Sequence, residues 1–195
     1  MKKRTIIVCV IVMALCIPLF VKIYDTNNRY VLPEEIWLDV GESFEYEGLR
    51  YELKDVEVYD IKGLAKRLDI QDSSFEQVGV LEGEKVKYFF VTLDLTALEE
   101  GYLFDLSQLG LYSRYSSAYT AEYGVIFQIN DQKVEKGLKV GESTEYYMVF
   151  KLSTLYYTEE GLEELDDNDI ALAVFDVENG RMNYLCKGGK LGMAD

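Results

Sequence analysis

The chain has 195 residues, of which 49% are hydrophobic and 28% charged, with 20 basic and 35 acidic side chains and a formal charge of −15. This length is sufficient for one hydrophobic core. Histidine is absent, which excludes histidine-dependent triads, histidine metal ligands and imidazole pH switches. The acidity argues against nucleic-acid binding, because that binding requires Lys and Arg to neutralise phosphates.

The N-terminal segment predicts a membrane anchor. Three basic residues at positions 2–4 precede the uncharged run Thr5–Val21, which Lys22 closes. A helix of this length nearly crosses a hydrocarbon core of about 30 Å, and its basic end stays on the cytoplasmic side. We expect a cytoplasmic tip at 1–4, a transmembrane signal anchor at 5–22 and an extracytoplasmic C-terminal domain at the cell membrane. The alternatives are a cleaved signal peptide, lipidation of Cys9 or Cys16, and a buried core helix.

The remainder of the chain has the composition of an acidic exported domain. Residues 30–195 carry 15 basic and 34 acidic side chains, a formal charge of −19. Such a domain is repelled by anionic lipids and polymers and projects away from the membrane. Cys186 is the only cysteine beyond the apolar run, so no disulfide within the domain is expected and packing alone must stabilise it.

The first elements after the anchor are a linker, a hairpin and a short helix. Polar residues and Pro33 predict a juxtamembrane linker over 23–38. The segments Ser43–Glu47 and Leu49–Leu53 predict a hairpin, and a change of alternation near Lys54-Asp55 predicts a bulge. The apolar spacing in residues 61–70 predicts a short helix or turn that crosses between sheets.

The remaining segments predict strands. Val86–Thr96 alternates, with Phe89, Val91, Leu93 and Leu95 on one face, and aromatic residues on both faces at its start indicate a central strand. Further strands are predicted around Val125, Phe127 and Ile129, over 146–152, over 170–174, and at Met182, Tyr184 and Cys186. Seven to nine strands with short connections predict an all-β Greek-key sandwich over 39–187, followed by a flexible tail at 188–195.

One short motif occurs twice. Residues 39–47 (DVGESFEYE) and 139–147 (KVGESTEYY) share V-G-E-S-x-E-Y, but their flanks differ. We interpret the motif as one turn-and-strand-entry structure used twice, with Gly41 and Gly141 supplying the turns. A repeated binding motif is the alternative.

These segments resemble a known family. V-G-E-S at 40–43, L-R-Y-E-L at 49–53, Y-F-F-V-T-L-D-L at 88–95 and the second V-G-E-S at 140–143 look like the immunoglobulin-like extracellular domains of unknown function on Gram-positive surface proteins. That group is related in fold to a mycobacterial secreted immunoprotective antigen. The resemblance covers roughly residues 38–187. It implies an immunoglobulin-like sandwich outside the cytoplasm and carries no catalytic residues.

The sequence contains no motif of a catalytic, cofactor or metal site. G-x-S-x-G, S-x-x-K, phosphate loops and dinucleotide fingerprints are absent. Cys186 falls on the apparently inward phase of its strand, which favours an inert buried thiol. In Thr158–Ile170 we expect Thr158 to cap a short acidic helix, with Leu162 and Leu165 packing inward. The acidic residues of that segment, Glu159 to Asp169, are interpreted as a solvated loop, with a weak cation site as the alternative.

The tyrosines of LYSRYSSAYTAEY form the candidate partner-binding surface. Their spacings of three, four and four would give one face on a helix but not on an extended loop, and the small residues between them are typical of recognition loops. Core or sheet-cover roles are the alternative. The residues are Tyr112, Tyr115, Tyr119 and Tyr123.

The sequence therefore predicts a membrane-anchored, extracytoplasmic binding or interaction module that performs no catalysis. Its expected partners are the membrane, through the N-terminal helix, and an envelope protein or glycan. A cell-envelope carbohydrate hydrolase with paired carboxylates is one alternative. An accessory subunit of a membrane complex is the other.

Overall fold

The computed structural model describes residues 16–25, 33–69, 83–100, 109–113, 120–130, 138–176 and 179–188. The chain divides into two compact units, Met1–Glu34 and Glu35–Asp195. Residues 16–25 of the first unit are helical and exposed. Within the described ranges no helix is both long enough and apolar enough to cross a bilayer. Most of the predicted anchor, residues 5–15, lies outside those ranges.

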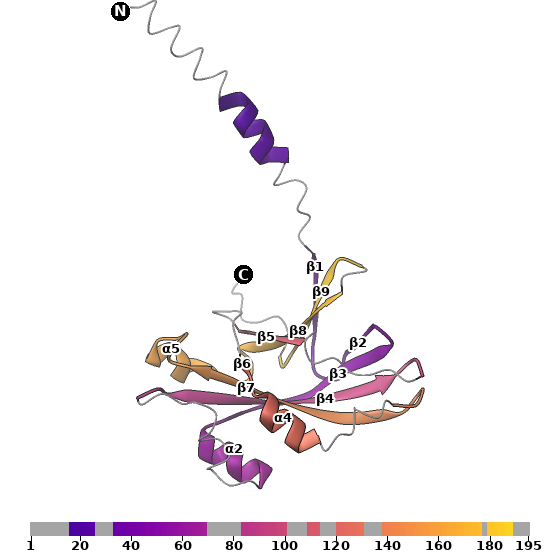
Figure 1. Cartoon of the computed structure of the whole chain (residues 1–195), viewed down its shortest axis with the longest axis vertical. Helices are drawn as coiled ribbons and strands as arrows, with labels where there is room; N and C mark the ends of the chain where they lie inside the picture. Colours follow the sequence, from indigo (N-terminus) through magenta and orange to yellow (C-terminus); the bar gives the residue numbers. More distant parts are fainter. Residues whose placement is uncertain are drawn as a thin grey trace, which may run out of the picture. The chain divides into compact units, whose positions relative to one another are not determined.

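The described part of the second unit is mainly β-structure in two sheets (Figure 1). One sheet has the order β1-β9-β8-β5 and the other the order β2-β3-β4-β7-β6. The prediction of a mainly β fold in two sheets is therefore confirmed. The strands are β1 (Glu34–Leu38), β2 (Ser43–Tyr46), β3 (Leu49–Tyr59), β4 (Val86–Ala97), β5 (Leu109–Ser113), β6 (Thr120–Ala121), β7 (Ser143–Ser153), β8 (Ile170–Asp176) and β9 (Arg181–Cys186).

The main core lies between the two sheets. In the five-stranded sheet β4 is central, and Leu93 pairs with Leu53 of β3 on one side and Tyr146 of β7 on the other. The alternation predicted for this strand is confirmed in its second half, where Leu93 and Leu95 are buried and Asp94 is not, while at its start both faces are buried, as expected for a central strand. Leu111, Leu172 and Leu185 of the four-stranded sheet belong to the same core cluster.

The predicted hairpin and bulge are also confirmed. β2 and β3 pair antiparallel, with Tyr46 opposite Leu49. Glu47 and Gly48 have φ angles of 44° and 74°, the two consecutive positive values that a tight hairpin turn of type I′ requires. The register of β3 against β4 shifts between Leu53 and Asp55.

Both V-G-E-S segments form the same turn before a strand, as predicted. Gly41 and Gly141 have φ angles of 84° and 78°. Each turn begins one residue before the motif, at Asp39 or Lys139. The carbonyl of this first residue accepts from the N–H of the motif's glutamate, at 2.9 Å for Glu42 and 2.8 Å for Glu142. The same glutamate's carboxylate accepts from the first residue's N–H, at 2.8 and 3.0 Å respectively. The repeated sequence thus encodes a local capping arrangement that starts β2 and β7.

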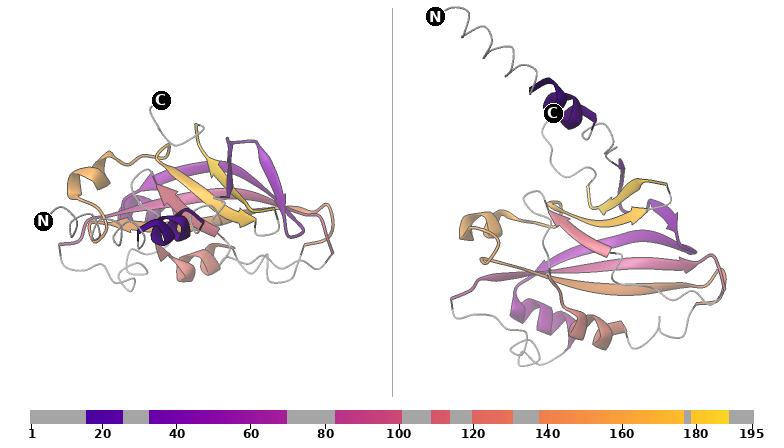
Figure 2. Two further views of the ribbon diagram at one scale, coloured as in Figure 1. Left: turned by 90° about the horizontal axis from the view of Figure 1, so that it is seen from above. Right: turned by 45° about the horizontal axis from the view of Figure 1, so that its top comes forward.

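Two helices form a third layer on the other face of the five-stranded sheet (Figures 1 and 2). In α2 (Ile61–Leu68), Asp60 accepts from the Gly63 N–H as N-cap, and Leu64 and Ala65 are buried. The prediction of a short helix is confirmed. The prediction that it crosses between sheets is wrong, because the strands before and after it, β3 and β4, are neighbours in one sheet.

The second helix of this layer, α4 (Tyr123–Asn130), corrects the strand predicted around Val125, Phe127 and Ile129. Val125 and Ile126 are buried, whereas Phe127 is 56% exposed. That pattern has the helical period rather than strand alternation. Tertiary contact with β7 outweighs the strand propensity of the β-branched residues.

The prediction that Cys186 and the residues alternating with it face the main core from the last strand is also wrong. In β9 the residue that faces the main core is Leu185. Tyr184 and Cys186 lie on the opposite face with Ala171 and Ala173 of β8. Cys186 is nevertheless fully buried, and its Sγ lies 3.5 Å from the carbonyl oxygen of Leu38 in β1.

Candidate functional site

The outer face of the four-stranded sheet carries a second apolar cluster, which we call the aromatic face. Strand alternation places side chains from all four strands on this side, away from the main core. Its small floor consists of Ala171 and Ala173, which are buried. Its large members are Trp37, Tyr112, Phe175, Met182 and Tyr184.

Three aromatic rings define the geometry of this face. Trp37 from β1 stacks on Tyr184 from β9, with ring centroids 4.2 Å apart and planes inclined by 12°. Tyr112 from β5 meets Tyr184 edge-on, with centroids 5.5 Å apart and an angle of 85°. Both arrangements are favoured by aromatic electrostatics. Tyr184 is consequently buried between the other two rings, which are themselves half-buried.

The remaining side chains extend the face toward solvent. Phe175 pairs with Met182 across β8 and β9, and Phe175 is 45% exposed. The Trp37 Nε1–H donates to Glu35 Oε2 at 3.4 Å. Burial raises the pKa of Tyr184, and the charge of Glu35 raises it further, so its hydroxyl remains protonated at neutral pH. The face thus offers apolar ring surface with polar groups at its margin.

The structure separates the predicted tyrosines. Tyr112 belongs to β5 and to the aromatic face, whereas Tyr123 begins α4 in the helical layer and is 49% exposed. Tyr115 and Tyr119 lie outside the described residues. Sequence reasoning did not place Trp37, Tyr184 or Phe175 at the site. The alternation of Met182 and Tyr184 does predict that they share one face of a strand, but the sequence alone favours the core face for them.

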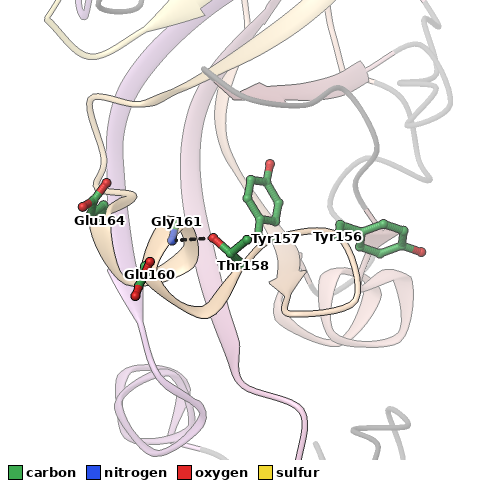
Figure 3. A pocket seen from close by; sticks show the side chains of 6 residues that line it. All are labelled: Tyr156, Tyr157, Thr158, Glu160, Gly161 and Glu164. Atoms are coloured by element: carbon green, nitrogen blue, oxygen red, sulfur yellow. Dashed lines mark hydrogen bonds between the residues drawn. The ribbon is translucent and has the colours of Figure 1, made fainter.

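A second feature is a hollow of about 390 Å³ where β7 leads into α5 (Glu159–Glu164). It is lined by Tyr156, Tyr157, Thr158, Glu160, Gly161 and Glu164 (Figure 3). Tyr157 is a packing residue here, because its hydroxyl hydrogen bonds with Ser113 Oγ at 2.8 Å in a buried position. Figure 3 shows Tyr156 directed away from the two carboxylates. The hydroxyl of Tyr156 and the carboxylates of Glu160 and Glu164 therefore do not converge on a common ligand position.

The acidic segment around α5 folds as predicted. Thr158 caps the helix by accepting from the Gly161 N–H at 3.1 Å, and Leu162 and Leu165 are buried. Asp167 lies 2.6 Å from Lys187 Nζ, which also lies 2.9 Å from Asp55. Among the described residues, no group of three or more Cys, Asp and Glu side chains is arranged to hold a metal ion.

Comparison with known proteins gives no assignment: no family model, no curated protein and no solved structure matches this chain.

Proposed function

We propose that this chain is a membrane-anchored, extracytoplasmic binding module that performs no catalysis and contacts an envelope protein or glycan through the aromatic face. The observation that carries this proposal is the set of rings contributed by β1, β5 and β9 on the outer face of the four-stranded sheet. Tyr and Trp are enriched where proteins contact partners, since they combine large apolar area with a polar group.

The distribution of the helices supports this choice of surface. In the five-stranded sheet, α2 and α4 cover the outer face, where Tyr88 and Phe90 are fully buried (Figure 1). On the four-stranded sheet, by contrast, Phe175 is partly exposed and Trp37 and Tyr112 are half-buried. Trp37 and Tyr112 lie on the two edge strands of this sheet, on either side of the buried Tyr184. Partly exposed aromatic side chains on one sheet face are suited to become buried by a partner.

An immunoglobulin-like relationship is part of the same proposal. The neighbouring position of the first strand, β1, and the last, β9, in the four-stranded sheet supports this relationship, because a Greek key also returns one strand to the side of a strand distant in the chain. The five-stranded sheet differs from antibody-type constant domains. In those domains the second and third strands lie in different sheets, whereas β2, β3 and β4 are successive neighbours here.

The proposal is tested by photo-crosslinking in intact cells that produce the full chain. A photoreactive phenylalanine analogue replaces Phe175 on the aromatic face or, as a matched control, Phe127 on α4, which is 56% exposed. We expect adducts from position 175 and few from position 127. The full-length chain should sediment with membranes, and protease added outside the cells should remove its C-terminal part.

Tyr112→Ser, combined with the analogue at position 175, then tests whether the rings contribute affinity. Loss of an interface residue worth about 2 kcal/mol lowers binding about 30-fold, so the adduct yield should fall sharply at a partner concentration below saturation. A thermal melt of the same variant verifies that the fold persists. Equal adduct yields from positions 175 and 127, or no adducts from position 175, would contradict the proposal.

A further inference from the structure

A buried carboxyl group lies at the junction of β6 and α4. Glu122 is 6% exposed. Its backbone N–H donates to the Val149 carbonyl of β7 at 2.9 Å, and its carbonyl accepts the Ile126 N–H that opens α4, also at 2.9 Å. The backbone of Glu122 is therefore fixed both to the edge of β7 and to the first turn of α4.

The surroundings of this carboxyl group do not compensate a negative charge well. Glu122 Oε1 is buried and accepts no hydrogen bond within the described structure. Among the described titratable groups, the charge of Lys151 in β7 acts on Glu122. The charges of Glu122 and of Glu84, which lies just before β4, both act on Tyr88 of β4. Lys151 Nζ lies 3.4 Å from Glu84 Oε1, and the two side chains are 12% and 2% exposed respectively. Lys151 therefore forms an ion pair with Glu84 and acts on Glu122 through its charge.

These surroundings determine which protonation state the fold prefers. Burial raises the pKa of Glu122 above its ordinary value of 4.5, and the charge of Lys151 only partly opposes this. Burial also raises the pKa of Tyr88 to about 12, so Tyr88 stays neutral when Glu122 titrates. A carboxyl group with a raised pKa stabilises the fold below its ordinary pKa, and this stability is lost as the pH rises through the folded-state value.

The segment that contains Glu122 covers the outer edge of β7. Backbone pairing with β6 is limited to two positions, opposite Lys151 and Phe150. Further along, the Asn130 side chain substitutes for a strand: its Oδ1 accepts from the Tyr147 N–H at 2.9 Å, and its Nδ2 donates to the Tyr147 carbonyl at 2.8 Å. If α4 moves away, these backbone groups of β7 become accessible.

We propose that residues 120–130 form a proton-operated latch: protonated Glu122 holds α4 on β7, and ionised Glu122 loosens α4 and opens the edge of β7. The consequence is an acid-closed, alkaline-loosened edge that presents unpaired strand groups to solvent or to an incoming strand. The proposal is independent of the aromatic face, which lies in the other sheet.

Amide exchange at Tyr147 tests the latch, because the hydrogen-bond acceptor of this N–H is the Asn130 side chain. Exchange is measured on the full chain from pH 5 to pH 8 and divided at each pH by the rate for Glu122→Gln. This ratio cancels the intrinsic pH dependence of exchange. We expect a ratio near one at pH 5 that rises about tenfold or more by pH 8. Glu160→Gln, an exposed carboxyl on α5, should leave the exchange of Tyr147 as in wild type.

Two further measurements keep the result decisive. The exchange of Leu93 in central β4 reports global unfolding, and its ratio should remain constant across the same pH range. A ¹³C titration of the Glu122 carboxyl in the unmodified chain should have the same midpoint as the loss of protection at Tyr147, which makes the test independent of whether the variant folds. A ratio that does not change with pH, a parallel change at Leu93, or a carboxyl midpoint at the ordinary value would overturn the latch.

Discussion

Asn130 provides the sharpest test of how α4 is attached to the sheet. This one buried side chain donates to the Ile126 carbonyl at 2.7 Å and to the Tyr147 carbonyl at 2.8 Å, and it accepts from the Tyr147 N–H at 2.9 Å. In Asn130→Ala the N–H and carbonyl of Tyr147 both lose their partner. We therefore expect the variant to weaken the whole attachment of α4 rather than one contact.

The expected magnitude follows from the two orphaned groups. An unsatisfied buried polar group costs about 1–3 kcal/mol. Tyr147 is half-buried, so water reaches part of the site and values near the lower end apply to each group. The better helix propensity of Ala returns about 0.5 kcal/mol. The free energy of unfolding should consequently fall by about 1.5–2.5 kcal/mol.

Urea denaturation of the full chain measures this loss. Gln128→Ala is the matched control, because it removes an amide from an exposed position of the same helix and should change stability by at most about 0.5 kcal/mol. Asn130→Asp keeps the shape and the acceptor but directs a carboxylate at two carbonyls. At neutral pH it should be as destabilising as Ala. Equal stability of the Asn130→Ala and Gln128→Ala variants would refute the strand-substitute role of Asn130.

Two further predictions address the sheet and its turns. Leu93→Ala removes a fully buried side chain of β4 and should lower the free energy of unfolding by about 3–5 kcal/mol. Asp94→Ala removes a carboxylate that lies 3.6 Å from Lys54 at a partly exposed site and should cost less than about 1 kcal/mol. Similar losses for the two variants in urea denaturation would mean that the register is wrong. In Gly141→Ala the added methyl group has no atom within 4 Å, but the residue must keep a φ of 78°, so thermal melts should show a loss of stability of about 1 kcal/mol. Gly124 in α4 has equal space and no positive φ, so Gly124→Ala should be neutral or stabilising.

Features encoded by neighbouring residues could be predicted from the sequence. The alternation in β4, the Glu47-Gly48 turn, both V-G-E-S turns and the Thr158 cap each depend on a few consecutive side chains and on local backbone preferences. Such local patterns predict the same turn, cap or strand whatever the rest of the chain contains. They were sufficient to predict a two-sheet, mainly β fold.

Features that depend on distant partners could not be predicted in the same way. The segment around Val125 and Phe127 has β-branched and aromatic residues typical of strands, and only its attachment to β7 through Asn130 selects the helix. In β9 the core face carries Asn183 together with Leu185, so the more regular apolar pattern of Tyr184 and Cys186 belonged to the other face.

The aromatic face illustrates the same limit for the candidate site. Tyr112 was identified because it lies in a tyrosine-rich segment, but its ring partner is Tyr184, which in turn stacks on Trp37 near the start of the folded unit. No spacing rule connects three residues so far apart in the chain. Only the order of strands in the four-stranded sheet brings them together.

The neighbouring position of β1 and β9 has a consequence for the order of folding. Trp37 stacks on Tyr184, and the Asp39 carboxylate accepts from the Gly188 N–H at 3.0 Å, so the first strand binds to the part of the domain that the ribosome makes last. Contacts of such large sequence separation form late and slow the search for the native state. The local β2-β3-β4 meander can assemble early, but β1 has no place to dock until β9 has been synthesised. We therefore expect folding of this domain to finish at its N-terminal strand, after β9 has left the ribosome.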